Sequence, residues 1–453
     1  TDVEINKIEY DSKKIVKNDV FVAINGYKEN GAEYISEAIE KGAVAIVAQR
    51  DEDISSFVSS SITIIRVENI RKALAIMAIA YYDNPASKLN MIGITGTKGK
   101  TTTAYMTRDI LLASGKKTGM IGTIYNTYGD VTIESSRTSP ESLDLQKLLR
   151  DMVDAGIEYV VMEVSSHALE LYRVYGITFK IGVFTNLAPE HLDFHKTMEN
   201  YLDAKMKLFD MSEYALINGD DIYAPKIIKR LKTKYATYGL DNAVNITATD
   251  IRVNSSNVQF KMYVNKMLET LLVKIPGKFT VYNALAAIGI TSFLNCQMDA
   301  IILALANVVV PGRCETVETG KNFSVIIDYA HNPSSMEAIL TSIKKFAKGR
   351  IITVFGCGGN RDTSKREEMG KISGKYSDFT VITSDNPRDE DPKKILTQIE
   401  DGIKTTKKLY KVIEDRKEAI KFAMRTILVR FMPLKIPARA TCGPSKIWNT
   451  DKM

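Results

Sequence analysis

The stretch from Ile92 to Thr103 constrains the fold of this chain more than any other part of the sequence. It reads Ile-Gly-Ile-Thr-Gly-Thr-Lys-Gly-Lys-Thr-Thr-Thr, so an apolar strand meets a glycine-bracketed loop and a Lys-Thr pair opens a helix. Backbone N–H groups of such a loop, with the positive end of the helix, form a cradle for polyphosphate. The sequence therefore predicts a P-loop that binds ATP or GTP, in preference to a plain glycine-rich turn.

Seven residues of this loop are predicted to bind the nucleotide. The Lys100 ammonium would reach the β- and γ-phosphates, and the Thr101 hydroxyl would hold Mg²⁺. The predicted set is Gly96, Thr97, Lys98, Gly99, Lys100, Thr101 and Thr102.

Length and composition exclude several other classes of protein. At 453 residues the chain is expected to form two to four domains, and its 45% hydrophobic and 25% charged residues are ordinary for a globular protein. No apolar run approaches membrane-spanning length, and Thr1 to Tyr10 is not a signal peptide. A net charge of +7 without an arginine stripe gives little support to a nucleic-acid partner. The four cysteines lack metal-type spacing, which suits a reducing cytoplasm.

Three sections are expected along the chain. Residues 1–88 carry short strands and helices and close at the turn Asn84 to Ser87. Residues 89–312 alternate buried-type strands with amphipathic helices, which predicts a mostly parallel α/β sheet covered on both faces. The strands expected there are Met91 to Ile94, Tyr159 to Glu163, Gly182 to Asn186 and Tyr214 to Asn218, with helices at Leu143 to Ala155 and Asn200 to Phe209.

A Pro311-Gly312 break introduces the third section, residues 313–453. Its expected strands are Ser324 to Asp328, Ile351 to Phe355 and Phe379 to Thr383, and its helices run from about Ser335 to Phe346 and from Pro392 to Lys404. Phosphate ligands of such parallel sheets bind beyond the carboxyl ends of the strands, and the P-loop lies at such an end.

Carboxylate and histidine side chains follow two of the central strands. Glu163 and His167 end one strand, and Glu190, His191, Asp193 and His195 follow the next. Beside a phosphate loop this pattern favours metal or phosphate chemistry over structural histidines. Glu163 with the Thr101 hydroxyl would form a first Mg²⁺ site, and His191 would complete a second. Lys205, read on its own, is a solvated helical lysine.

Seven short motifs occur in an order that resembles the Mur ligases of peptidoglycan synthesis. They are Gly-Thr-Lys-Gly-Lys-Thr-Thr, Met-Glu-Val-Ser-Ser-His, Thr-Asn-Leu-x-x-Glu-His-Leu-Asp-x-His, Ala-Lys-x-x-Leu-Phe, Tyr-Asn-x-Leu-Ala-Ala, Pro-Gly-Arg-x-Glu and Asp-Tyr-Ala-His-Asn-Pro. The resemblance runs from about Ile8 to Met424 and is strongest to the members that add the third amino acid. It implies an N-terminal domain for the UDP end of the substrate, a central P-loop ATPase and a C-terminal dinucleotide-fold-like domain for the incoming amino acid.

The resemblance assigns roles to individual residues. It implies that Lys205 is carbamylated by CO₂ and becomes an anionic oxygen ligand of the second of two Mg²⁺ ions; a carbamate can hold this hard cation, whereas an ammonium cannot. Catalytic roles fall on Lys100, Glu163, His191, Lys205 and His331, and the base that accepts the amine proton is expected among His191, His195 and His331. Residues expected to border the ATP from across the domain cleft are Asn283, Arg313 and Asp328.

The substrate sites are implied in the same way. Ser12 would face the uracil end of the UDP-MurNAc-dipeptide, and Thr138, Ser139, Ser165 and Arg173 would bind its muramoyl-dipeptide part. The amino acid would be held by Arg361, Asp385, Asn386, Pro387 and Arg388. Two arginines suit the second carboxylate of meso-diaminopimelate, which L-lysine lacks.

The sequence also departs from the family pattern. Lys98 stands where an asparagine is more usual; an extra cation there would either assist phosphate binding or face solvent, and the second is favoured. Leu171 replaces a glutamine. After about residue 425 the expected Gly-Lys-Gly-His-Glu motif is absent, and we interpret this atypical tail as a reading-frame disruption or a gene-annotation error near residue 426.

The resulting hypothesis is a cytoplasmic, monomeric, ATP-dependent amide ligase that adds a diamino acid, expected to be diaminopimelate, through an acyl phosphate. An L-lysine-adding enzyme and a folylpolyglutamate synthase are the alternatives within enzymes. A nucleotide switch is disfavoured, because the only Asn-Lys pair of the guanine-reading type, Asn265-Lys266, lacks the aspartate that reads guanine.

Overall fold

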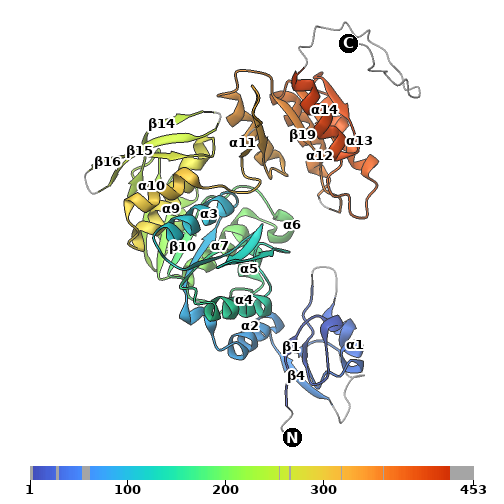
Figure 1. The fold of residues 1–453 in the computed structure, drawn as a ribbon. Coiled ribbons are helices and arrows are strands. Elements are labelled where there is room, and N and C mark those ends of the chain that lie inside the picture. The colour runs from blue at the N-terminus through green and yellow to red at the C-terminus, as the bar shows by residue number, and fades with distance from the viewer. Residues whose placement is uncertain are drawn as a thin grey trace. The chain divides into compact units, whose positions relative to one another are not determined.

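The computed structural model describes residues 4–26, 30–53, 62–254, 256–264, 267–317, 319–360 and 362–428 (Figure 1). Contacts divide the chain into two compact units. The first holds the residues up to Gly320 together with Ser324–Tyr329, and the second holds Lys321–Phe323 and the residues from Ala330 onward. The predicted section boundaries at 88/89 and 312/313 remain predictions, and residues 429–453 of the atypical tail lie outside the described residues.

The N-terminal section of the first unit is a small parallel sheet in the order β1-β2-β3-β4. Strand β2 and the first four residues of β3 are apolar and buried, as is typical of parallel strands covered on both faces. The section comprises β1 (Ile8–Glu9), η1 (Ser12–Lys14), β2 (Val20–Val22), η2 (Gly31–Tyr34), α1 (Ile35–Glu40), β3 (Ala45–Gln49), β4 (Thr63–Val67), α2 (Ile70–Tyr81) and η4 (Pro85–Lys88).

The central section is built on a nine-stranded sheet in the order β13-β12-β11-β10-β5-β9-β6-β7-β8. Its strands from β13 to β6 run parallel, and the hairpin β7–β8 extends one edge antiparallel. The predicted parallel α/β sheet is thus confirmed. The bounds are β5 (Asn90–Thr95), β6 (Thr118–Ile121), β7 (Tyr125–Tyr128), β8 (Val131–Glu134), β9 (Tyr159–Glu163), β10 (Ile181–Phe184), β11 (Tyr214–Asn218), β12 (Lys234–Gly239) and β13 (Ile246–Thr247).

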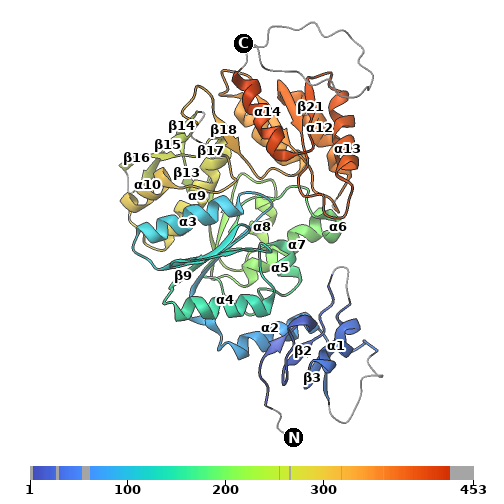
Figure 2. The ribbon, with the colours of Figure 1, turned by 45° about the vertical axis from the view of Figure 1, so that its right-hand side comes forward.

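Helices cover both faces of this sheet, and Figure 2 shows α3 and α4 on opposite sides of β9. On one face α3 packs against α9 and α10. On the other, leucines of α4 pack on Met91, Val160 and Met162 of the sheet. The bounds are α3 (Lys100–Ala113), α4 (Ser142–Asp154), α5 (Ser166–Glu170), α6 (Leu192–His195), α7 (Met198–Asp210), α8 (Ala224–Arg230), α9 (Lys278–Phe293) and α10 (Met298–Asn307).

Two small antiparallel sheets complete the first unit. One has the order β14-β15-β16, with β14 (Thr249–Val253), β15 (Val258–Val264) and β16 (Met267–Val273). The other pairs β17 (Glu315–Val317) with β18 (Val325–Ile327). The strand expected at Ser324 to Asp328 is present as β18, which pairs antiparallel with β17 and lies in the first compact unit. Its expected membership of the third section remains a prediction.

The second unit is a separate α/β fold with the parallel sheet β19-β20-β21. Its core joins apolar residues of the helices α11, α12 and α13 to Phe355 and Ile382 of the sheet. The bounds are α11 (Pro333–Lys344), β19 (Ile352–Phe355), α12 (Ser364–Tyr376), β20 (Phe379–Ile382), α13 (Pro392–Lys404), β21 (Tyr410–Val412) and α14 (Arg416–Leu428). The strands and helices predicted from residue 335 onward match these elements to within two residues at each end.

Candidate active site

The P-loop connects β5 to α3 at the carboxyl end of the parallel sheet, where the sequence predicted it. Gly96 and Gly99 have φ values of +147° and +88°, a region that L side chains rarely adopt. A Cβ on Gly96 would lie 1.9 Å from Thr185 Oγ1, and one on Gly99 would lie 2.5 Å from Asn283 Oδ1. Both glycines are therefore required by the backbone and by the space around it.

The β10–α6 connection fixes the loop from the side. The Lys98 carbonyl accepts hydrogen bonds from Thr185 Oγ1 at 2.6 Å and from Asn186 Nδ2 at 2.9 Å. Thr97 Oγ1 accepts a hydrogen bond from the Ala188 N–H at 3.0 Å. The loop is thus held in a fixed shape by the Thr-Asn-Leu-Ala motif that follows β10.

Lys100 lies inside the curve of the loop. Its ammonium donates to the carbonyls of Gly96 and Thr97 at 2.8 and 3.0 Å. Burial lowers the pKa of this lysine, while Glu163 and Glu190 act in the opposite direction. Lys98 is half-buried, and burial lowers its pKa as well.

Thr101 and Glu163 meet at the first predicted metal position. Thr101 Oγ1 donates to Glu163 Oε2 at 2.9 Å, and the carboxylate, only 1% exposed, also accepts from the Thr123 N–H at 2.8 Å and from Thr123 Oγ1 at 3.1 Å. Hydroxyl and carboxylate oxygens are the ligands that Mg²⁺ prefers, so this pair fits the ion. Thr102, the residue after Thr101, is buried in the first turn of α3.

Arg313, Asp328 and Asn283 belong to the same compact unit as the P-loop. Arg313 Nη2 lies 3.4 Å from Thr101 Oγ1, and its guanidinium stacks on the Tyr329 ring at 4.4 Å. Asp328 Oδ2 accepts from the Cys314 N–H at 2.9 Å. Asn283 Oδ1 is 3.4 Å from Thr103 Oγ1. Thus Arg313 and Asn283 contact the start of α3 directly.

Lys205 and His191 form the second predicted metal position. Lys205 is 1% exposed, and its Nζ lies 4.4 Å from the centroid of the Tyr201 ring. Burial and the nearby Lys100 hold the pKa of Lys205 well below its usual range. Interpreting it as a solvated lysine was therefore wrong. His191 precedes α6 with φ of +56°, and Lys100 and Lys205 both contribute to lowering its pKa, after burial.

The three histidines of the central section lie together. The His167 ring centroid is 4.8 Å from that of His191 and 5.6 Å from that of His195, and His195 Nε2 is 2.9 Å from Ser166 Oγ. His331 lies in the second unit, where its carbonyl accepts from Lys365 Nζ at 3.0 Å. In the parts of the chain that the structure describes, no group of three or more His, Cys, Asp or Glu residues could by itself hold a metal.

Four residues expected to bind the muramoyl-dipeptide form one hydrogen-bonded group beside Glu163. Ser139 Oγ donates to the Glu163 carbonyl at 2.9 Å and lies 3.3 Å from Ser165 Oγ. Arg173 Nη1 donates to the Ser139 carbonyl at 3.3 Å, and Thr138 Oγ1 is 3.1 Å from Thr123 Oγ1. Ser12, expected to face uracil, lies in the N-terminal section, where its hydroxyl donates to Glu37 Oε2 at 2.6 Å.

The second unit brings two loops together around the Asp385-Asn386-Pro387-Arg388 motif. The Gly359 N–H donates to the Asn386 carbonyl at 2.9 Å, and a Cβ on Gly359 would lie 1.8 Å from the Pro387 carbonyl oxygen. Arg388 Nη1 donates to the Gly359 carbonyl. Arg361 lies outside the described residues.

Several residues that shape these sites were not found from the sequence. Thr123 holds the Glu163 carboxylate, Glu141 contacts Arg173 at 3.2 Å, and Arg366 pairs with Glu390. Glu141 follows Pro140 in the predicted dipeptide motif, which was its only signal. The others occupy positions that no local pattern singles out.

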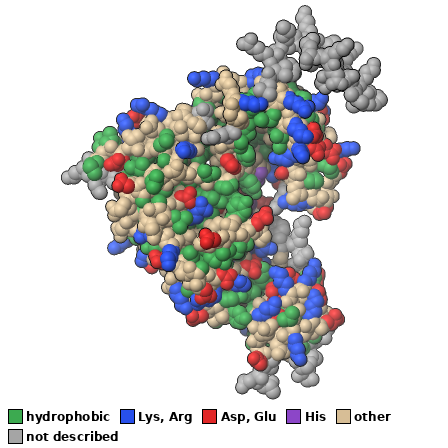
Figure 3. Space-filling view, in the orientation of Figure 1, with side chains coloured by type: hydrophobic (Ala, Val, Ile, Leu, Met, Phe, Trp, Pro, Cys, Tyr) green, Lys and Arg blue, Asp and Glu red, His purple; other side chains and the backbone are tan. Residues whose placement is uncertain are grey.

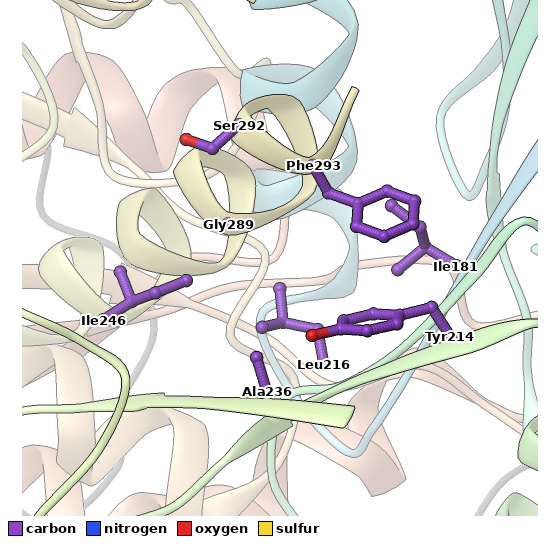
Figure 4. Close-up of a pocket in the computed structure, with 8 residues that line it drawn as sticks. All are labelled: Ile181, Tyr214, Leu216, Ala236, Ile246, Gly289, Ser292 and Phe293. Atoms are coloured by element: carbon purple, nitrogen blue, oxygen red, sulfur yellow. The ribbon is translucent and has the colours of Figure 1, made fainter. Parts of the chain in front are cut away.

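A cavity elsewhere in the first unit is not this site. It measures about 240 Å³ and lies between α9 and the strands β10, β11 and β12, with the Tyr214 and Phe293 rings stacked at 4.7 Å (Figure 4). The cavity contains none of the predicted site residues. On the face shown in Figure 3, basic and acidic side chains are interspersed rather than separated by sign. Among the described helices, none has the length and apolar character needed to span a membrane.

Together, the P-loop, the Thr101–Glu163 pair and the parallel sheet define a P-loop nucleotide-binding α/β protein. Family models assign the chain more narrowly: the Mur ligase family catalytic domain matches residues 4–82, the Mur ligase middle domain residues 94–291 and the Mur ligase glutamate ligase domain residues 312–429. The chain therefore belongs to the Mur ligase family, whose members are ATP-dependent ligases.

Individual relatives agree with this assignment. A UDP-N-acetylmuramoyl-L-alanyl-D-glutamate–2,6-diaminopimelate ligase of Caldanaerobacter subterraneus subsp. tengcongensis is 49% identical over 423 residues, covering 93% of this chain and 87% of the relative. A solved structure of an enzyme with the same name has 27% identity and a TM-score of 0.67, over 92% of this chain and 86% of that one. A folylpolyglutamate synthase of Mycobacterium tuberculosis, with 16% identity and a TM-score of 0.64 over 79% of this chain and 88% of that one, shares the fold.

Proposed function

We propose that this chain joins meso-diaminopimelate to UDP-N-acetylmuramoyl-L-alanyl-D-glutamate in peptidoglycan synthesis, at the expense of ATP. The observation that carries the proposal is the buried P-loop site, in which Lys100, Thr101 and Glu163 lie beside the Ser139–Ser165–Arg173 group. The diaminopimelate ligase that is 49% identical over 93% of the chain supports the substrate pair.

The proposed reaction has two steps. The γ-carboxylate of D-glutamate attacks the γ-phosphorus of ATP, which gives an acyl phosphate and ADP. The amine of the third amino acid then attacks the acyl carbon, phosphate leaves, and the proton of the amine passes to a base. Lys100 holds the β- and γ-phosphates and Arg313 supports the phosphate end from beside Thr101, so the protein acts mainly by positioning and charge neutralisation. His191, His195 and His331 are the candidate bases.

Two metal positions accompany this proposal. Thr101 and Glu163 would hold one Mg²⁺, and His191 with a carbamate on Lys205 would hold the other. Bound Mg²⁺ would neutralise phosphate charge. Support for the carbamate comes from the burial of Lys205 and its depressed pKa, because only the neutral amine reacts with CO₂.

The amino acid would bind in the second unit at Asp385, Asn386, Pro387 and Arg388, with Arg361. An arginine is suited to the far carboxylate of diaminopimelate, since its guanidinium can form a two-point, charge-assisted pair. An L-lysine-adding enzyme has no such carboxylate to hold. We further propose that the protein works as a monomer in the cytoplasm.

One assay tests the proposal. Phosphate release should require UDP-MurNAc-dipeptide and diaminopimelate together, and L-lysine or L-glutamate in place of diaminopimelate should give little. Lys100→Ala should abolish the release, whereas Lys180→Ala, which alters an exposed pair with Glu213, should not. Phosphate release with a folate and glutamate, or with lysine in preference to diaminopimelate, would replace the proposal by the corresponding alternative.

A further inference from the structure

Glu141 is a buried carboxylate that faces three arginines. Its side chain is 2% exposed and lies 3.1 Å from Arg71 Nη1, 3.4 Å from Arg137 Nη1 and 3.2 Å from Arg173 Nε. Arg71 and Arg173 are themselves 15% and 13% exposed, whereas Arg137 is about half exposed. One carboxylate thus organises guanidinium groups from three separate segments of the chain.

The arginines reach Glu141 from different parts of the first unit. Arg71 is in the first turn of α2 in the N-terminal section, and its Nη2 also donates to the Asn25 carbonyl at 2.6 Å. Arg173 follows α5 in the central section and also donates to the Ser139 carbonyl at 3.3 Å. Glu141 itself is the N-cap residue of α4, and its side chain makes no capping hydrogen bond there. Its carboxylate is therefore committed to the arginines rather than to the helix.

The charges of this group do not cancel. Three guanidinium groups face one carboxylate, so the group keeps an excess of positive charge beside the Ser139–Ser165 hydrogen bonds. Burial lowers the pKa of Arg173, and Glu141 is the first group that opposes this effect. An excess of buried positive charge suits an anionic ligand, provided that the guanidinium groups are held in place.

We infer that Glu141 is a positioning residue for the UDP-MurNAc-dipeptide: it orients the Arg173 guanidinium toward a carboxylate of the dipeptide and ties it, through Arg71, to the N-terminal section. This inference rests on the proposed function, because Arg173 acts on that substrate only there. Glu141 does not touch the substrate. Without it, Arg173 would lose its charged partner and sample other rotamers, which costs binding energy.

The test compares Glu141→Gln with the parent chain by isothermal titration calorimetry. The variant should bind UDP-MurNAc-dipeptide about tenfold more weakly, because the Arg173 side chain must then be ordered when the ligand binds. Its affinities for UDP alone and for ADP should be unchanged, since Arg173 is assigned to the dipeptide. Misfolding would lower the affinities for all three ligands together. Weaker binding of the UDP-MurNAc-dipeptide alone therefore distinguishes a positioning role from a structural defect.

Two further variants sharpen the test. Asp144→Asn, also on α4, removes the acceptor of the 2.5 Å hydrogen bond from the Tyr10 hydroxyl, which joins the N-terminal section to α4 without touching Arg173. It should leave binding of UDP-MurNAc-dipeptide unchanged. Glu141→Gln combined with Arg173→Lys should be no weaker than Arg173→Lys alone, because both changes remove the same oriented guanidinium.

Three outcomes overturn the inference. The first is that Glu141→Gln binds UDP-MurNAc-dipeptide as tightly as the parent or more tightly, which is what the loss of a negative charge alone would predict. The second is that Asp144→Asn weakens this binding as much as Glu141→Gln does. The third is that the losses of affinity from Glu141→Gln and Arg173→Lys add up in the double variant. Failure of the parent chain itself to bind UDP-MurNAc-dipeptide would instead refute the proposed function, and with it the premise of this inference.

Discussion

Arg366 and Glu390 form a two-point ion pair inside the second unit. Nη1 lies 2.9 Å from Oε2 and Nη2 lies 3.0 Å from Oε1, and the arginine side chain is fully buried. The same guanidinium donates to Gln398 Oε1 at 2.7 Å and to the Gly358 carbonyl at 3.2 Å. Because Glu390 comes two residues after Arg388, this pair holds the loop of the proposed amino-acid site against the loop after β19.

We predict that Arg366→Met destabilises the second unit by about 2 kcal/mol, because Gln398 Oε1 and the Gly358 carbonyl lose the hydrogen bonds that the buried guanidinium donates. Hydrogen exchange of peptides covering residues 352–412 in increasing urea would measure the loss, since a chain of two units is not expected to unfold in one step. Glu367→Gln on the same helix is the matched control: it breaks an exposed pair with Lys371 and should change stability by less than about 0.5 kcal/mol. Equal protection in Arg366→Met and the parent would show that the pair contributes nothing.

The features predicted well from the sequence are those that local patterns determine. The P-loop, the central strands and α13 (Pro392–Lys404) follow from apolar runs, glycines and helix-start residues within short windows. The antiparallel pairing of β18 with β17 was not predicted, because a short apolar run does not specify its partner strand.

Long-range contacts account for what the sequence did not reveal. Glu141 meets an arginine 70 positions earlier, and Arg366 meets a glutamate 24 positions later. Lys205 looks like a solvated lysine in its own helix, but it is 1% exposed and lies near enough to the P-loop Lys100 for that charge to help lower its pKa. Charged partners of this kind are set by the tertiary fold, so only the structure identifies them.

Gly122 is predicted to be intolerant of a side chain. A Cβ there would lie 2.5 Å from Glu163 Oε1, and the φ of Gly122 is outside the left-handed region, so the clash is with the carboxylate and not with the backbone conformation. Gly122→Ala should displace Glu163 from Thr101 and lower kcat for phosphate release by about a hundredfold. Gly349→Ala, where no atom lies within 4 Å of the added Cβ, is the control and should keep full activity. A Gly122→Ala enzyme with parental kcat would mean that the position of Glu163 is not critical.

The described cysteines should differ in reactivity. Burial raises the pKa of the Cys357 thiol to about 11, and its Sγ lies 3.8 Å from Met369 Sδ. At pH 8 the folded protein should therefore hold Cys357 as an unreactive thiol, whereas the partly exposed Cys296 should be alkylated by iodoacetamide. Peptide mass spectrometry would follow both sites, and urea should abolish the difference. Rapid labelling of Cys357 in the folded chain would contradict its burial.

Lys205→Arg is predicted to lower phosphate release at least a hundredfold, because arginine keeps a positive charge but forms no carbamate. Because its pKa is depressed, Lys205 has a larger fraction of neutral amine near pH 8 than an ordinary lysine has. Acidification should protonate this amine and so prevent its reaction with CO₂. Activity should therefore fall in CO₂-free buffer at low pH and return when bicarbonate is added at pH 8.

Lys207→Arg, on the same helix but in an exposed 2.7 Å pair with Glu170, is the control and should behave like the parent. The parent chain equilibrated with ¹³C-labelled bicarbonate should show a carbamate carbon signal that Lys205→Arg lacks. Full activity of Lys205→Arg, or the same signal in both proteins, would mean that this amine enters the site only as a buried lysine.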